Sequence, residues 1–158
     1  MLCNHHRAPR WIAAGAMALA ALTTTLAPAA AQAQEFVSIK GSTANVRATP
    51  STRAPVRWEL SKGYPLQVIK HQGSWLRVKD NEATLGWVHQ GVTGKAAHMV
   101  VTAPTANLRA GPGQNHRRVA RLEQGDVLRT LKKQGGWVQV QRSNGASGWV
   151  AGNLVWGW

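Results

Sequence analysis

The sequence predicts an all-β protein built of two tandem units of about 60 residues each, preceded by a signal peptide. Three observations support this prediction: an internal duplication, short apolar runs separated by turn-forming residues, and one longer apolar run near the N-terminus. The 158 residues are 44% hydrophobic and 16% charged, which is an ordinary globular composition. A wholly disordered or collagen-like chain is therefore excluded.

The N-terminal segment is typical of a secretory signal peptide. Arg7 and Arg10 precede an unbroken apolar run over residues 11–22, and the small residues that follow end in Ala31-Gln32-Ala33. A membrane-spanning helix needs about 20 apolar residues, so this run is too short to be an anchor. We expect cleavage after Ala33, which gives a periplasmic or secreted protein with no membrane span left in the mature chain.

The chain is strongly basic, with 19 Lys and Arg residues against 6 Asp and Glu. Without Arg7 and Arg10, 17 basic residues remain against the 6 acidic ones, so residues 34–158 carry a formal charge of +11. Anionic partners are therefore the first to consider. The only cysteine, Cys3, lies in the predicted signal peptide, which excludes thiol catalysis and disulfides in the mature chain.

The duplication defines the domain organisation. With a constant offset of 62 and no gap, Thr43 to Val88 matches Thr105 to Val150 at 17 of 46 positions, whereas unrelated chains would share about 3. Two copies predict tandem domains over residues 34–93 and 94–158, the second ending in an apolar tail. The clearest matches are TANVRATP at 43–50 with TANLRAGP at 105–112, KHQGSWLRV at 70–78 with KKQGGWVQV at 132–140, and LGWV at 85–88 with SGWV at 147–150.

Each copy predicts short strands and no helix. Leu76 and Val78 alternate with Arg77, so the two aliphatic side chains face the core and Trp75 faces the opposite side. Asn81-Glu82, like residues 143–145 of the second copy, favours a hairpin turn. In the first copy the predicted strands lie at 36–39, 45–47, 56–60, 66–69, 75–78 and 86–88, separated by Gly, Pro, Ser, Asn or Asp.

The order N-[VL]-R-x-x-P, G-x-x-L, G-x-W-x-x-V and G-W-V resembles the bacterial SH3 domains, and the pair of copies resembles the two-domain exported proteobacterial members of that family. The resemblance covers about 120 residues. It implies two small SH3-like β-barrels of five or six strands, acting as a binding module, which in many relatives binds peptidoglycan or its peptide stems. The first copy departs from the family pattern at Thr49 and Ser51, where the family prefers Gly, and this bears on its loop but not on its fold.

Two polar residues recur in both copies. Arg47 and Arg109 could bind the carboxylates of a stem peptide with a bidentate guanidinium, or they could hold the carbonyls of the long loop that follows. Asn45 and Asn107 suit either a ligand contact or a backbone-bonding turn.

Tryptophans also recur in register. A flat ring with a free N–H can stack on a sugar face or on an alanyl-rich peptide, and the alternative is that each ring covers one side of the barrel. Trp156 and Trp158, in the tail, are expected to fold back over the domain junction, and the alternative is that they form an exposed docking patch. The candidate ligand-binding residues are therefore Asn45, Arg47, Trp75, Trp87, Asn107, Arg109, Trp137 and Trp149.

We find little basis for catalysis in the sequence. The histidines of the mature chain lack metal-ligand spacing, and no acidic residue recurs between the copies. We expect no catalytic residue, no metal and no cofactor, and hence no enzyme.

The predicted function is a non-enzymatic exported module that binds cell-wall peptidoglycan through stem peptide or glycan. Two alternatives stay open: an adaptor that docks another envelope protein, and an electrostatic binder of anionic envelope polymers. Nucleic acid is not an expected partner, because an exported protein meets little of it.

Overall fold

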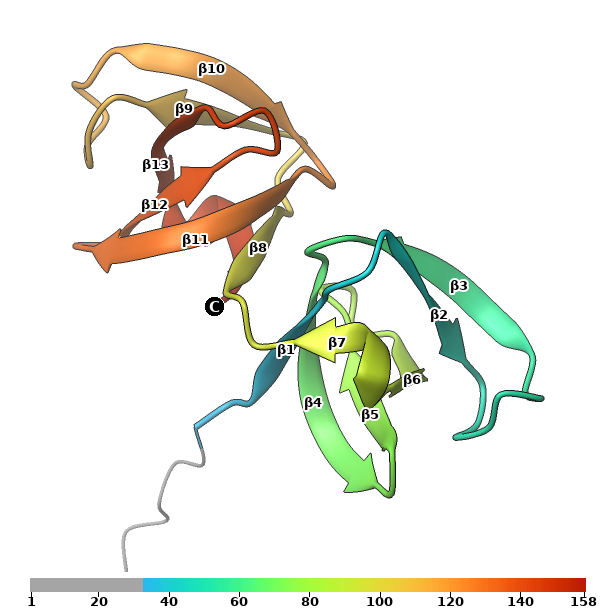
Figure 1. Ribbon diagram of the computed structural model, residues 1–158. Helices are drawn as coiled ribbons and strands as arrows, with labels where there is room; N and C mark the ends of the chain where they lie inside the picture. The colour runs from blue at the N-terminus through green and yellow to red at the C-terminus, as the bar shows by residue number, and fades with distance from the viewer. Residues whose placement is uncertain (1–32) are drawn as a thin grey trace, which may run out of the picture. The chain divides into compact units, whose positions relative to one another are not determined.

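The computed structural model describes residues 33–158 (Figure 1). The predicted signal peptide lies outside the described residues, apart from Ala33. Within residues 33–158 the regular structure consists of strands and two single-turn 3-10 helices, which confirms the all-β prediction. No helix in this part of the chain is long and apolar enough to cross a membrane.

The strands form two seven-stranded antiparallel sheets, one for each copy of the duplication, and each sheet curls around its own core (Figure 1). The first sheet has the order β3-β2-β6-β5-β4-β1-β7. Its elements are β1 (Phe36–Ile39), β2 (Thr43–Arg47), β3 (Val56–Ser61), β4 (Pro65–Gln72), β5 (Trp75–Lys79), β6 (Leu85–His89), η1 (Gln90–Val92) and β7 (Thr93–Gly94).

The second sheet repeats this topology in the order β10-β9-β13-β12-β11-β8-β14. Its elements are β8 (His98–Val101), β9 (Thr105–Arg109), β10 (Arg118–Glu123), β11 (Val127–Gln134), β12 (Trp137–Gln141), β13 (Ser147–Ala151), η2 (Gly152–Leu154) and β14 (Val155–Gly157). The strands expected from the apolar runs are all present, most of them longer by one to four residues.

Each sheet buries one face, as the alternation in the sequence predicts. Leu76 and Val78 are 3% and 0% exposed, whereas Trp75 points to the outer face and is half-buried. The first core contains Val37, Ile39, Val46, Leu66, Leu76, Val78 and Val88, and the second contains Val101, Leu108, Leu122, Leu128, Val138, Val140 and Val150. The two domains thus have separate apolar cores, and their outer faces carry the candidate site residues.

One cross-strand pair differs in size between the copies. Val46 lies opposite Trp58 in the first sheet, whereas Leu108 lies opposite Ala120 in the second. The neighbouring glycines make room for these pairs: a Cβ on Gly86 would collide with Val46 and come within 3.0 Å of the Trp58 ring, and one on Gly148 would come within 2.8 Å of Leu108. In each sheet a smaller side chain therefore faces a larger one at this pair. The larger side chain is on β3 in the first copy and on β9 in the second.

The long loop after the second strand has the same backbone hydrogen bonds in both copies. In the first copy Ala48 N donates to Pro55 O and Ala54 N donates to Ser51 O. The equivalent donors at positions 110 and 116 bind the equivalent acceptors in the second copy. The loop conformation is thus retained where the first copy departs from the family pattern.

The C-terminal tail lies against the first strand of the chain, as expected for a segment that covers the junction. Phe36 in β1 meets Trp156 edge-on at a centroid distance of 5.2 Å and stacks on Trp158 at 5.5 Å with an interplanar angle of 20°. Thr130 Oγ1 donates a 2.7 Å hydrogen bond to the carbonyl oxygen of Trp158. These contacts join the two sheets through three aromatic rings.

Candidate functional site

Three of the predicted site residues come together in one groove of the first domain. The groove has a volume of about 270 Å³, and its lining includes Asn45, Arg47 and Trp75 together with Glu59 and His89. These side chains come from four strands that are far apart in sequence but adjacent in the sheet.

Strand register accounts for this grouping. Asn45 lies directly opposite Glu59 in the β2–β3 pair, and Trp75 lies opposite His89 in the β5–β6 pair. All four belong to the outer face, because their sequence neighbours are buried in the core. The Trp75 and His89 rings meet edge-on, with centroids 5.3 Å apart and an interplanar angle of 88°.

The imidazole of His89 is held in place by the short helix η1. Its Nδ1 accepts a 3.1 Å hydrogen bond from the backbone N–H of Gly91. The Nδ1 atom is therefore unprotonated in this hydrogen bond, and the ring stays edge-on against one side of Trp75.

The arginines that both copies share bind the backbone of their own loops. Arg47 Nη1 donates a 2.6 Å hydrogen bond to Ala54 O, and Arg109 Nη1 donates a 2.8 Å hydrogen bond to His116 O. Both acceptors lie seven residues beyond the arginine. Of the two roles considered for these residues, the geometry supplies the loop contact directly, while Arg47 also lines the groove.

Trp87 and Trp149 lie on the outer face of the sheets but are not among the residues that line the groove. Trp87 is flanked in register by Arg47 and Arg77, and Trp149 by Arg109 and Gln139. Asn107 lies opposite Arg121, where Asn45 lies opposite Glu59.

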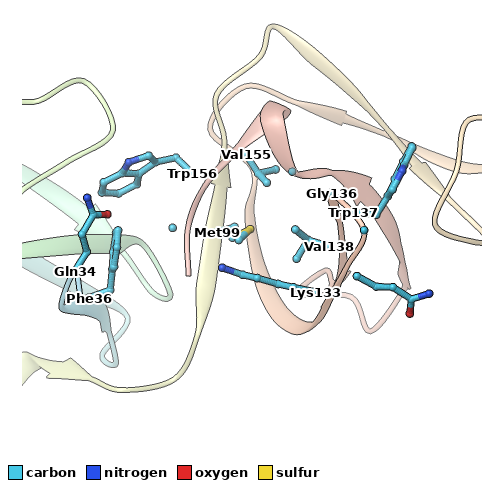
Figure 2. Close-up of a pocket in the computed structure, with 13 residues that line it drawn as sticks. Gln34, Phe36, Met99, Lys133, Gly136, Trp137, Val138, Val155 and Trp156 are labelled. Atoms are coloured by element: carbon cyan, nitrogen blue, oxygen red, sulfur yellow. The ribbon is translucent and has the colours of Figure 1, made fainter. Parts of the chain in front are cut away.

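Trp137, the partner of Trp75 in the second copy, lines a different cavity. This junction pocket has a volume of about 480 Å³ and includes Phe36, Met99, Lys133, Trp137 and Trp156. Figure 2 shows Phe36 and Trp156 at one end and Trp137 at the other, with Met99 and Lys133 between them. The remaining wall contains four glycines, so backbone is exposed to the cavity.

An acidic residue next to this pocket is already paired. Glu35 Oε1 accepts a 2.6 Å contact from Lys95 Nζ, and its Oε2 lies 2.8 Å from His71 Nε2. The hydrogen bonds from Lys95 and His71 lower the pKa of the Glu35 carboxyl. The carboxylate is therefore directed to these two residues and not to Lys133.

Sequence reasoning missed Glu59, His89 and Lys133 as pocket residues. It gave weight to residues that recur in both copies, whereas these three are replaced by Arg121, Ala151 and His71 at the equivalent positions. Cross-strand pairing was the signal that could have found Glu59 and His89, since each lies opposite a candidate residue. No group of three or more potential metal-ligating residues lies together in residues 33–158.

The two sheets define a protein with tandem small β-barrels whose outer faces carry aromatic and charged residues. Two family matches, both to the description "Bacterial SH3 domain", cover residues 40–94 and 104–155. The chain belongs to the bacterial SH3 domain family, with one match for each copy of the duplication.

A curated relative is 25% identical over 122 residues: the putative N-acetylmuramoyl-L-alanine amidase YrvJ of Bacillus subtilis (strain 168). The alignment covers 70% of this chain and 23% of the relative, so the chain spans about a quarter of that protein. Solved structures with similar chains include NlpC2 of Trichomonas vaginalis, with a TM-score of 0.37 and 10% identity over 79% of this chain and 48% of that one. An NlpC/P60 family protein of Bacillus cereus ATCC 10987 has a TM-score of 0.38 and 16% identity over 78% of this chain and 56% of that one.

The relative corrects the expectation that the protein is not an enzyme. That expectation rested on the lack of a recognisable catalytic set in the sequence, whereas the curated protein that the chain matches is named as an enzyme. A chain built of binding domains can share those domains with an enzyme, so the absence of catalytic motifs does not exclude an enzymatic context.

Proposed function

We propose that this protein acts at the bacterial envelope, where its tandem domains bind the peptidoglycan of the cell wall. The observation that carries the proposal is the groove of the first domain, in which Asn45, Arg47 and Trp75 meet. Membership of the bacterial SH3 domain family and similarity to a putative N-acetylmuramoyl-L-alanine amidase support the same choice of polymer.

The groove offers the chemistry that a peptide or glycan needs. The half-buried ring of Trp75 presents an apolar face for stacking, and Asn45 and Glu59 supply polar groups beside it. A volume of about 270 Å³ suits a short segment of a polymer and not a whole small protein.

The tryptophan of the second copy adds a second contact along the same polymer. Trp137 lines the junction pocket, so each domain carries one half-buried tryptophan in a concavity. Two weak contacts on one chain of the wall raise the overall affinity well above that of either alone. The relative is named as an amidase. We infer that binding by the tandem domains would keep an amidase activity of this kind close to the cell wall.

Sedimentation of the purified protein with isolated sacculi at low and high salt tests the proposal. The formal charge of +11 on residues 34–158, from 17 basic and 6 acidic residues, will draw the mature chain to any polyanion at low salt, and salt screens that attraction. Stacking is less sensitive to salt, so binding should persist at high salt. Trp75→Ala and Trp137→Ala should each weaken it, about 5- to 150-fold for a contact of 1–3 kcal/mol.

Ile69→Ala and Leu131→Ala provide a matched control, because they remove exposed apolar side chains at equivalent positions of the two copies. Circular dichroism would establish that all variants are folded. Loss of binding by the parent at high salt would favour general attraction to anionic polymers. Unchanged binding by the folded double tryptophan variant would favour docking to another envelope protein.

A further inference from the structure

The two recurring tryptophans lie in pockets with different charged groups. Trp75 shares its groove with the carboxylate of Glu59 and with the guanidinium of Arg47, whereas Trp137 shares the junction pocket with Lys133 alone among charged residues. The duplication has therefore kept the ring, while a free carboxylate lies in the first pocket and none lines the second.

In the groove, Glu59 is the only acidic lining residue and has no ion-pair partner among residues 33–158. Arg47, which lines the same groove, donates through Nη1 to Ala54 O and forms no ion pair with Glu59, and Nδ1 of His89 accepts from Gly91 N. Glu59 is exposed on β3, so its carboxylate is accessible to a ligand.

The second copy reverses this charge at the same place in the sheet. Arg121 lies opposite Asn107 in the register that Glu59 has opposite Asn45. An ammonium group that suits the first position would be repelled at the second.

In the junction pocket, Lys133 is the only charged lining residue (Figure 2). Its ammonium group has no carboxylate partner in the described part of the chain, because Glu35 is paired with Lys95 and His71. The aromatic rings of Phe36, Trp137 and Trp156 supply apolar walls of this pocket, and the Lys133 ammonium group points toward its Phe36 end (Figure 2). The pocket thus suits a group with an apolar or ring face and one negative charge.

We propose that the two sites take oppositely charged groups of the same polymer: an ammonium group in the groove at Glu59, and a carboxylate in the junction pocket at Lys133. The inference rests on the proposed function, since peptide stems of the wall carry both free amines and free carboxylates. The tandem then selects a polymer with both charges, which a simple polyanion does not have.

Chemically modified sacculi separate the two sites. One batch has its free amines acetylated and a second has its free carboxylates amidated, and both are compared with untreated sacculi at one physiological salt concentration. The variants are Glu59→Gln and Lys133→Gln. The matched controls are Glu82→Gln and Lys132→Gln, which change the net charge by the same amount at exposed positions outside both pockets.

On untreated sacculi, each variant should bind about two- to fivefold more weakly than its control, as expected for one exposed ion pair. Acetylation of the amines should abolish the deficit of Glu59→Gln and leave that of Lys133→Gln. Amidation of the carboxylates should have the reverse effect.

The inference is overturned if either variant binds untreated sacculi as well as its control does, or if its deficit persists after the matching modification. It is also overturned if the opposite modification removes the deficit. Failure of the proposed function has a different signature, since the parent itself would then not bind untreated sacculi at high salt.

Discussion

Ala83 and Gly145 occupy equivalent positions of the hairpins that lead into β6 and β13, and both have positive φ, at 63° and 85°. Their N–H groups donate to Asp80 O and Arg142 O, so the two turns share one conformation. A non-glycine residue in this region costs about 1 kcal/mol or more. Ala83→Gly should therefore raise the free energy of unfolding by about 1 kcal/mol, and Gly145→Ala should lower it by a similar amount. Urea denaturation measures both changes.

Glu82→Gly is the control for this pair, because Glu82 is not in the positive-φ region and glycine there adds only chain entropy. It should destabilise the protein. A loss of stability in Ala83→Gly as well would show that the turn does not gain from glycine.

Residue-scale predictions from the sequence succeeded where one strand decides the outcome. The alternation around Trp75 was enough to place that ring on the outer face. Glu59 and His89 join the groove only through register with neighbouring strands, and both lie at positions where the copies differ. A residue that is present in both copies is one that the shared fold needs. A search for such residues therefore misses Glu59 and His89, which the second copy replaces.

The long loops over residues 48–55 and 110–117 are held by the shared arginines. Arg47→Ala removes a charge-assisted hydrogen bond to Ala54 O, so the free energy of unfolding should fall by about 1.5 kcal/mol. The N–H of Ala48, which donates to Pro55 O, should exchange with deuterium faster. Hydrogen exchange with mass spectrometry measures the second effect.

Arg53→Ala is the matched control, since Arg53 is an exposed arginine of the same loop whose guanidinium has no hydrogen-bond partner in residues 33–158. It should leave both stability and exchange nearly unchanged. Equal effects of the two substitutions would contradict the loop-holding role of Arg47.

At the scale of elements, the strands and their order were largely predictable, while the loop was not. Gly111 is needed in the second copy because a Cβ there would come within 2.6 Å of the His116 ring. The first copy has Thr49 and Ala54 at these positions, so the small residue and the large one have exchanged places. The compensating residue lies five positions away, and a comparison position by position does not reveal it.

Phe36 contributes the aromatic part of the contact between the two domains. It contacts Trp156 and Trp158 of the tail, while the two apolar cores remain separate. Scanning calorimetry of the parent should show one unfolding transition. Phe36→Ala should split or broaden it, because the aromatic contacts that link the domains are lost.

Leu85→Ala, at an exposed apolar side chain in β6, serves as the control and should retain one transition. Two transitions in the parent would show that the domains unfold independently of this cluster. The tail was predicted to cover the junction from its composition alone, whereas its pairing with Phe36 depends on where β1 lies in the sheet.

Tandem copies with shared sequence face the hazard that strands of one copy pair with strands of the other while the nascent chain folds. The unequal cross-strand pairs described above act against this error. If β3 paired with β9, Trp58 would lie opposite Leu108 and overfill that core, and Ala120 against Val46 would leave a void. The difference in side-chain volume at this one pair therefore favours strand pairing within a copy over strand pairing between the copies.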